Sequence, residues 1–325
     1  MDGRLGNNSL FGPVEDNLKF VEERVRAAAH VEMALLASMI DHVLARGGKR
    51  IRPAMTLLAG HLFNYDLERL LPMATGVELL HNGTLVHDDI VDSSSIRRGR
   101  PTAGTVWNTG AALLLGDYLL ANAAEQVSRT ENTRVMRLFA ETLMTICKGE
   151  LSQAQTLNQP SIRREDYYRR IAHKTASLFS MASESGAVLA GAPEDAVQAL
   201  RQYGHDFGMA FQVVDDILDF TATEAELGKP VGSDLLQGTI TLPTVLFLEE
   251  APQSNPVRSL LDSADRTAGL PDALAAVRES GAISEAYSMA EEFAAAARRV
   301  LASLPDGETR RTLDSLAEYT VRRQT

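Results

Sequence analysis

The sequence predicts an all-α protein, and three observations support this prediction. Apolar residues recur at helical spacing along almost the whole chain from residue 14 onwards. The β-branched runs are short, and none is joined to another by a hairpin turn. Neither an internal repeat nor a low-complexity linker interrupts the pattern. We therefore expect a single helical domain over residues 14–325, preceded by a flexible arm at residues 1–13 that is rich in glycine and asparagine.

The helices can be placed in order from their start and stop residues. Helical spacing from about residue 14 to residue 44 ends at Gly47-Gly48. Pro53 suits the first turn of the next helix, which ends near residue 63, and a long helix then begins near Leu67. The remaining helices are expected at about 108–128, 131–157, 164–190, 194–222, 240–250, 256–263, 271–279, 282–303 and 307–323, with a loop over 223–238.

The composition is that of an ordinary globular protein and argues against several classes of function. Of the 325 residues, 45% are hydrophobic and 23% are charged. The net charge of −11 argues against a nucleic-acid partner and against permanent docking on an anionic membrane. A single cysteine, Cys147, allows neither an intramolecular disulfide nor a thiolate metal cluster. The most apolar run, residues 111–124, is broken by Asp117 and is too short to cross a bilayer, so we expect a soluble, cytoplasmic protein without stable membrane insertion.

An aspartate-rich motif lies at the C-terminal end of the helix that begins near Leu67. Residues 81–92 read His-Asn-Gly-Thr-Leu-Val-His-Asp-Asp-Ile-Val-Asp. Because a helix advances about 100° per residue, Asp88 and Asp92 share one face and Asp89 lies at its edge, so three carboxylates are crowded onto one patch. Like charges one turn apart destabilise a helix, and a bound divalent metal would reverse that effect.

A second motif of the same form, Asp215-Asp216-x-x-Asp219, follows much later in the chain. Most charge runs are solvated helix faces. Here the apolar neighbours, among them Ile90 and Ile217, indicate helices buried on most sides, where carboxylates need partners or metals. Because the flanks of the two motifs differ, we interpret them as two facing helices rather than as a duplication.

Two groups of cations accompany the first motif. The segment 47–53 places Lys49, Arg50 and Arg52 just ahead of a helix, whose N-terminus favours anions, and diphosphate fits this combination. A solvated loop between helices is the alternative. The segment Arg97-Arg98-Gly99-Arg100 is near enough to the first motif to reach phosphates chelated there, although a purely structural role as a helix cap competes with this interpretation.

These segments occur in the order found in trans-isoprenyl diphosphate synthases, and from about residue 15 to its C terminus the chain resembles this polyprenyl synthetase family. The matching segments are Gly47–Pro53, His81–Asp92, Arg97–Thr102, Lys174-Thr175, Phe211–Asp219 and Gly228–Leu235. Residues 237–243 resemble the longer-chain members, of the heptaprenyl, octaprenyl and solanesyl type. The resemblance implies the isoprenoid synthase fold, one large helical bundle around a central cavity, and a homodimer.

The resemblance also implies a reaction and a metal. Members condense isopentenyl diphosphate with an allylic diphosphate (geranyl, farnesyl or geranylgeranyl), head to tail, with Mg²⁺, and three ions per active site are expected with substrate bound. Mg²⁺ prefers carboxylate, water and phosphate oxygens, which fits the ligands available. By this resemblance metals are held by Asp88, Asp92 and Asp215, supported by Asp89, Asp216 and Asp219.

The remaining site residues are assigned by the same resemblance. Isopentenyl diphosphate is assigned to Lys49, Arg52, His81 and Arg98, and the departing diphosphate to Arg97, Lys174 and Lys229. Oxygens of Thr175 and Gln212 face the allylic cation, in a dry cavity that excludes water. No side-chain nucleophile is required, so Cys147, His87 and the serines 93–95 are taken as non-catalytic. Those serines replace residues that are often acidic in the family.

The length of the product depends on the helix turns that precede Asp88. A growing chain would pass Thr84, Gly83, Leu80, Val77 and Gly76. Shorter-product relatives place aromatic residues at the positions that match Gly83 and Thr84, and both are small here. This predicts an open tunnel and a long product, in the heptaprenyl to decaprenyl range of quinone side chains. In the alternative, Gly83 only permits close helix packing, a bulky residue deeper in the cavity stops growth, and geranylgeranyl diphosphate is the product.

Two further classes of protein compete with this interpretation. A class I terpene cyclase also ionises diphosphates with an aspartate-rich helix, but its second metal motif differs and it has no use for a second diphosphate pocket. A non-catalytic subunit that modulates a partner synthase usually lacks one or both aspartate motifs, and both are complete here.

Overall fold

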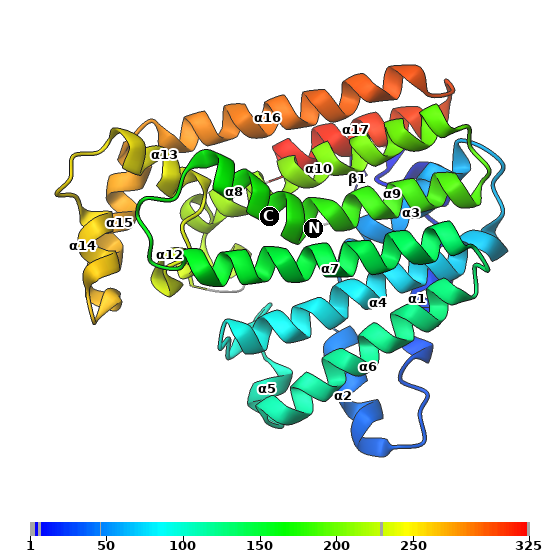
Figure 1. Ribbon diagram of the computed structural model, residues 1–325, viewed down its shortest axis with the longest axis horizontal. Helices are drawn as coiled ribbons and strands as arrows, with labels where there is room; N and C mark the ends of the chain where they lie inside the picture. The colour runs from blue at the N-terminus through cyan, green and yellow to red at the C-terminus, as the bar shows by residue number, and fades with distance from the viewer. Residues whose placement is uncertain (1–3, 6–7, 46, 228–229, 324–325) are drawn as a thin grey trace. The chain divides into compact units, whose positions relative to one another are not determined.

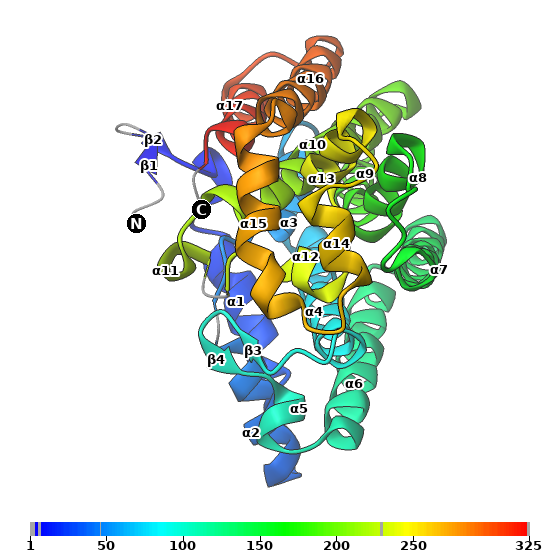
Figure 2. The same cartoon turned by 90° about the vertical axis from the view of Figure 1, so that its left-hand side faces the viewer.

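The computed structural model describes residues 4–5, 8–45, 47–227 and 230–323, and the regular structure in these ranges is almost entirely helical (Figures 1 and 2). The helices of the N-terminal half are η1 (Gly12–Val14), α1 (Leu18–Ala27), α2 (Ala34–Leu44), α3 (Ile51–His61), α4 (Leu67–Val91), α5 (Ala103–Val106), α6 (Thr109–Ser128) and α7 (Thr133–Thr156). The later helices are α8 (Arg164–Ile171), the π-turn η2 (Ala172–Ala176), α9 (Ser177–Leu189), α10 (Glu194–Thr221), α11 (Glu224–Leu227), α12 (Ser233–Gln237), α13 (Leu242–Glu250), α14 (Pro256–Asp262), α15 (Arg266–Glu279), α16 (Ala282–Val300), η3 (Leu301–Ser303) and α17 (Glu308–Arg322).

Strands are limited to two short antiparallel pairs in the described ranges. β1 (Arg4–Leu5) pairs with β2 (Asn8–Ser9), and β3 (Ile96–Arg97) pairs with β4 (Arg100–Pro101). The predicted all-α class is therefore confirmed. None of the helices in the described part combines the length and the apolar character that crossing a bilayer requires.

The chain divides into two compact units, and each is described by itself. The first unit comprises Met1–Leu143, Leu178–Gly204 and Arg298–Leu316. The second comprises Met144–Ser177, His205–Ala297 and Ala317–Thr325. The first aspartate motif belongs to the first unit and the second motif to the second unit. The expectation of a single domain over residues 14–325 around a central cavity remains a prediction.

Close helix packing in the first unit depends on glycines. Helix α4 lies along α6, as both views show (Figures 1 and 2). Helix α9 meets the backbone of α3 at Gly186, where an added Cβ would lie 3.0 Å from the carbonyl carbon of Thr56 and closer still to its oxygen. Since these are backbone atoms, the two helices could not keep this distance with a larger residue at position 186.

The second unit has its own apolar core. Buried aromatic and aliphatic side chains from α8, α10 and the helices α12 to α16 form it, including Tyr167, Val213, Ile217, Phe220 and Val277. This core holds α10 on its apolar side, which fixes the backbone that carries the second aspartate motif. Burial of such side chains is the main favourable contribution to stability in a unit of this kind.

Several expected helix boundaries are wrong. The helix expected over residues 14–44 is two helices, α1 and α2, because the chain leaves the helical conformation between Ala28 and Met33. The loop expected over 223–238 contains α11 and α12, and α15 begins at Arg266 rather than near residue 271. Asp265 explains this early start, since its side chain accepts a hydrogen bond from the Thr267 amide and caps the helix. The helix expected over 164–190 has the expected bounds within a residue, as α8, the π-turn η2 and α9 follow one another without a break.

The N-terminal arm is packed at its described end. Leu10 and Phe11 are each 6% exposed, and η1 follows them directly. Residues 1–3 and 6–7 lie outside the described ranges, so the expectation of a flexible arm there stays a prediction.

Candidate active site

The first aspartate motif closes α4, and its three carboxylates have different environments. Asp88 and Asp92 are partly exposed, one turn apart, and the Asp92 amide donates to the Asp88 carbonyl at 2.8 Å. Asp89 is only 6% exposed, and its carboxylate accepts a hydrogen bond from Nε of Arg97 at 2.5 Å. The three carboxylates therefore have two kinds of environment: those of Asp88 and Asp92 are partly exposed, and that of Asp89 is buried and paired with Arg97.

The cations after the first motif lie on a hairpin that sequence patterns did not predict. β3 and β4 are joined by Arg98 and Gly99, whose φ angles of 51° and 72° are both positive. A two-residue turn with both φ angles positive matches the twist of antiparallel strands, and glycine adopts this conformation without strain. The hairpin brings Arg97 to Asp89, while the Arg98 guanidinium donates to the carbonyl of Gly47.

The residues assigned to isopentenyl diphosphate lie close together in the first unit. The Arg52 guanidinium carbon is 4.3 Å from the centre of the Phe179 ring, and Nη1 of Arg52 is 3.2 Å from Nε2 of His81. Arg98 lies beside Gly48, since an added Cβ there would be 3.4 Å from its Nη1. Lys49 is exposed in the same segment. Arginine 50 differs from its neighbours, because it pairs with the buried carboxylate of Glu78.

His81 is neutral in this environment. Burial lowers its pKa well below the ordinary 6.5, and the positive charges of Arg52, Arg98, Arg97 and Arg50 lower it further. Since a guanidinium can only donate, Nε2 of His81 accepts from Arg52 and its proton is assigned to Nδ1. We call Lys49, Arg52, His81 and Arg98 the cationic cluster. His81 therefore adds no positive charge to this cluster, but its Nδ1–H can donate a hydrogen bond to an anion.

The second aspartate motif, on α10 in the second unit, shows the same division between exposed and buried carboxylates. The side chain of Asp215 is 49% exposed. Asp216 is 3% exposed and accepts from the Tyr167 hydroxyl at 2.7 Å and from Gln212 Nε2 at 2.8 Å. Asp219 is 1% exposed and accepts from the Ser233 hydroxyl and from the Asp234 amide. Burial raises the pKa of Asp216 to about 7, and the nearby charge of Asp234 contributes to this shift.

A chain of hydrogen bonds connects the residues assigned to the allylic cation. The Thr175 hydroxyl donates to Oε1 of Gln212 at 2.7 Å, and the amide group of Gln212 donates to Asp216. Thr175 lies on the π-turn η2, a conformation that is rare and is often found at functional sites. Nζ of its neighbour Lys174 is 2.8 Å from Oε1 of Glu150. Gly149 on α7 permits this approach, since an added Cβ would lie 2.9 Å from the Lys174 amide nitrogen.

Sequence patterns did not point to one residue of the second unit, Arg323. The guanidinium of Arg323 donates to Oδ1 of Asp215 at 3.0 Å and to the carbonyl of Phe211 at 2.6 Å. Arg323 and Asp215 are separated by 108 positions, so no local motif joins them. Lys229, which the resemblance assigned to the departing diphosphate, lies outside the described residues, as does Gly228.

The residues assigned to the product tunnel are closely packed. Val77 and Leu80 are fully buried, and Thr84 is partly exposed. A Cβ on Gly83 would lie 3.0 Å from Cδ2 of Leu120 and 3.3 Å from the Gly116 carbonyl oxygen, both on α6. A Cβ on Gly76 would lie 2.7 Å from Cγ2 of Val127. Both glycines therefore permit close packing of α4 on α6, which was the alternative explanation for Gly83.

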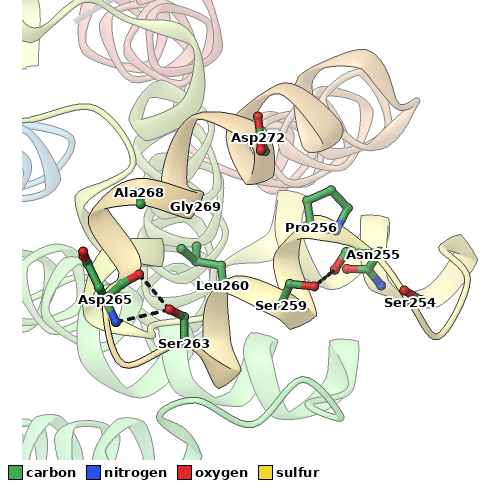
Figure 3. A pocket seen from close by; sticks show the side chains of 10 residues that line it. All are labelled: Ser254, Asn255, Pro256, Ser259, Leu260, Ser263, Asp265, Ala268, Gly269 and Asp272. Atoms are coloured by element: carbon green, nitrogen blue, oxygen red, sulfur yellow. Dashed lines mark hydrogen bonds between the residues drawn. The ribbon is translucent and has the colours of Figure 1, made fainter.

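A surface depression in the second unit is unrelated to these residues. It lies between α14 and α15 and includes Asn255, Ser259, Ser263, Asp265 and Asp272 (Figure 3). Its polar groups have structural roles: Asn255 caps α14, and the Ser263 hydroxyl donates to the Asp265 carbonyl. Nothing in this lining resembles a catalytic arrangement.

The exposed carboxylates suit a metal that is shared with a ligand. In the described part of the chain, no three histidine, cysteine, aspartate or glutamate side chains form a ready-made metal site. Mg²⁺ is commonly held by one or two carboxylates, several waters and the phosphates of a substrate, rather than by a complete protein cage. Asp88 in the last turn of α4 with Asp92 just after it, and Asp215 on α10, offer such partial ligand sets, so these residues fit Mg²⁺.

Comparison with known proteins identifies the family. The profile described as polyprenyl synthetase matches residues 33–276. Heptaprenyl diphosphate synthase component 2 of Geobacillus stearothermophilus is 39% identical over 311 residues, which cover 96% of this chain and 97% of the relative. The crystal structure of heptaprenyl diphosphate synthase from Staphylococcus aureus superimposes with a TM-score of 0.91 at 35% identity, covering 96% of this chain and 99% of that one. The Caulobacter crescentus polyprenyl synthase, solved with calcium and isoprenyl diphosphate, gives 0.91 at 32% identity and 96% coverage of both chains.

The chain therefore belongs to the polyprenyl synthetase family, and the family resemblance of the sequence is confirmed. It is a prenyltransferase. Within the family, the relatives named here include enzymes that make long-chain prenyl diphosphates.

Proposed function

We propose that this protein is a trans-polyprenyl diphosphate synthase, which condenses isopentenyl diphosphate head to tail with an allylic diphosphate primer. One observation supports the proposal most directly. The six motif aspartates divide into three that are exposed or partly exposed (Asp88, Asp92, Asp215) and three that are buried (Asp89, Asp216, Asp219). This is the division expected if the first three bind metals and the other three hold the backbone and its neighbours in place.

In this proposal Mg²⁺ is held by Asp88, Asp92 and Asp215, with three ions in the complete substrate complex. Bound Mg²⁺ supplies positive charge that stabilises the diphosphate as it leaves. The Arg97 guanidinium, held by Asp89, and the ammonium group of Lys174 add positive charge for the same leaving group. Lys229 is assigned the same task.

The cationic cluster of the first unit binds isopentenyl diphosphate. Stacking on Phe179 and the hydrogen bond to His81 fix the Arg52 guanidinium, so little conformational entropy is lost when it binds a diphosphate. Lys49 and Arg98 add charge, and neutral His81 donates from Nδ1.

The condensation then needs no side-chain nucleophile. The allylic carbon–oxygen bond breaks and its electron pair leaves with the diphosphate. The double bond of isopentenyl diphosphate attacks the allylic cation, and the released diphosphate removes the proton. Thr175 and Gln212, oriented by Asp216 and Tyr167, present oxygens to the cation without supplying a reactive nucleophile.

We further propose a long-chain product, in the heptaprenyl to decaprenyl range, that serves as a quinone side chain. Two similar proteins are named as heptaprenyl diphosphate synthases, which supports this length. The glycines at positions 76 and 83 do not support it independently, because they pack against α6. A geranylgeranyl product is the alternative.

The working assembly is proposed to be a cytoplasmic homodimer. Two exposed leucines on α6, Leu113 and Leu114, offer apolar surface for a second copy. A heteromeric enzyme is the second candidate, since the relative from Geobacillus stearothermophilus is named as component 2 of its synthase.

A product assay tests the proposal. The purified protein is incubated alone with Mg²⁺, farnesyl diphosphate and labelled isopentenyl diphosphate, and the extracted chains are sized by chromatography. A narrow distribution of long all-trans chains is expected. A C20 product would support the condensation reaction but would replace the proposed long-chain product by geranylgeranyl diphosphate. Incorporation only after a second, different chain is added would replace the homodimer by the heteromeric enzyme, and no incorporation with any primer would refute the proposal.

A further inference from the structure

The side chain of Arg323 donates a hydrogen bond to one oxygen of Asp215, the exposed carboxylate of the second aspartate motif. Its Nη2 is 3.0 Å from Oδ1 of Asp215 and also donates to the Phe211 carbonyl. Its guanidinium carbon lies 3.8 Å from the centre of the Phe211 ring. Phe211 and Asp215 are one helical turn apart on α10, so Arg323 is held by the same turn that presents the carboxylate.

This is not an ordinary surface ion pair. The side chain of Arg323 is only 7% exposed, whereas the adjacent Arg322 is 71% exposed and pairs with Glu318 one turn earlier on α17. Exposed pairs of the second kind contribute little to stability. The ring, the carbonyl and the carboxylate together fix Arg323, and this arrangement keeps its positive charge beside Asp215.

A positive charge at this distance changes what Asp215 can bind. A divalent cation on the same carboxylate would be repelled by the guanidinium, because both are positive and share one negative group. A diphosphate removes this conflict, since its oxygens carry enough negative charge for a metal ion and a guanidinium together.

We propose that Arg323 makes metal binding at Asp215 depend on diphosphate: it weakens binding of a divalent ion to the free protein and ceases to oppose it when diphosphate is bound. This inference rests on the proposed function, because it takes Asp215 as a metal ligand. Arg323 is thus a residue that acts through Asp215. The consequence for the enzyme is an order of binding, in which the metal at the second motif arrives with the diphosphate rather than before it.

The experiment measures divalent-ion affinity rather than turnover. Free Mn²⁺, which suits the same carboxylate and water ligands as Mg²⁺, is followed by electron paramagnetic resonance in titrations of the full-length protein. Each titration is made with and without inorganic diphosphate, and a protein-free sample corrects for Mn²⁺ bound by diphosphate. The variant Asp215→Asn defines which part of the binding belongs to Asp215.

Arg323→Met removes the charge and keeps a long side chain that can cover Phe211. We expect it to raise the Asp215-dependent affinity about tenfold or more without diphosphate, the size of repulsion between such charges even in a water-like dielectric. With diphosphate present the change should be less than about twofold, so the coupling between the two ligands falls. Arg323→Lys, which keeps the charge, should restore the weak affinity.

Arg322→Met is the matched control, because it removes the same charge from the neighbouring position without a contact to Asp215. It should leave both affinities unchanged. Unchanged or weaker Mn²⁺ binding by Arg323→Met would overturn the inference, since it would show that Arg323 supports the carboxylate instead of opposing the ion. If Asp215→Asn itself leaves Mn²⁺ binding unchanged with and without diphosphate, the metal assignment of the proposed function fails, and the inference fails with it. Far-ultraviolet circular dichroism and thermal unfolding establish that each variant is folded.

Discussion

Gly186→Ala should destabilise the first unit and disturb the isopentenyl diphosphate residues, although it adds a single methyl group. The added Cβ would lie 3.0 Å from the Thr56 carbonyl carbon, closer to the carbonyl oxygen, and 3.1 Å from Cβ of Ala59, whereas ordinary contacts begin near 3.4 Å. Since Thr56 contributes backbone atoms, no side-chain rotation relieves the overlap. Helices α3 and α9 must separate by roughly 0.5–1 Å, a gap that forfeits a quarter to a half of each dispersion contact across it.

The expected loss in the free energy of unfolding follows from two opposing effects. Overpacking of this kind costs about 1–3 kcal/mol and lost interface contacts add to it, while alanine is favoured over glycine in a helix by about 1 kcal/mol. The net loss in the free energy of unfolding is therefore about 2 kcal/mol. Arg52 on α3 stacks on Phe179 of α9, so the same separation should raise the KM for isopentenyl diphosphate.

Urea unfolding followed by circular dichroism measures the stability, and initial rates measure the KM. Gly104→Ala is the control in the same unit, because its Cβ would meet its nearest neighbours at 3.9–4.0 Å. That variant should unfold within about 0.5 kcal/mol of the parent protein. If Gly186→Ala is as stable as Gly104→Ala, the close contact of α3 and α9 does not have the importance we assign to it.

Three further changes test other parts of the structure. His81 stays neutral in the folded protein, whereas in the unfolded chain it takes up a proton below about pH 6.5. The free energy of unfolding should therefore fall as the pH is lowered from 7.5 to 5.5, and it should fall less steeply in His81→Gln. Equal slopes for the two proteins would contradict the lowered pKa of His81. Tyr167→Phe removes a donor from buried Asp216 and should cost about 1–3 kcal/mol of stability, whereas Tyr168→Phe, whose hydroxyl donates to the weakly accepting Met289 sulfur, should cost much less. Equal losses in the two variants would contradict a stabilising role for the Tyr167 hydrogen bond. Thr84→Phe places an aromatic ring at a partly exposed position one helical turn before Asp88, and it should shorten the products sharply in the sizing assay. An unchanged product profile would show that the growing chain does not pass this face of α4.

The sequence predicted the helices and both aspartate motifs because these depend on local patterns. Spacing alone puts Asp88 and Asp92 on one face of α4, and both are accessible there. The break between α1 and α2 was missed because residues 28–33 contain neither glycine nor proline. Its position is set by packing, since Ala28 and Ala29 are buried and Met33 provides no side-chain cap for α2.

The contacts that define each carboxylate could not be predicted, because they join residues far apart in the chain. Tyr167 and Asp216 are 49 positions apart, and Arg323 and Asp215 are 108 positions apart. The close approach of α4 to α6 at Gly83 is likewise a property of two helices together. Small residues at positions 83 and 84 are equally compatible with a tunnel and with packing, and only the neighbouring helix distinguishes them. The hairpin at Arg98-Gly99 was missed because its strands are only two residues long.

The central claim is that both aspartate motifs serve one prenyl-transfer reaction, and the most direct test is labelled isopentenyl diphosphate incorporation by single Asp→Asn variants. Asp88→Asn and Asp215→Asn should each reduce the rate at least about 100-fold, a loss comparable to removal of one strong electrostatic contribution to a transition state. Asp272→Asn, in the depression between α14 and α15, should keep the parent rate (Figure 3). Parent-like rates for Asp88→Asn or Asp215→Asn would contradict the account, and so would an equal loss in Asp272→Asn.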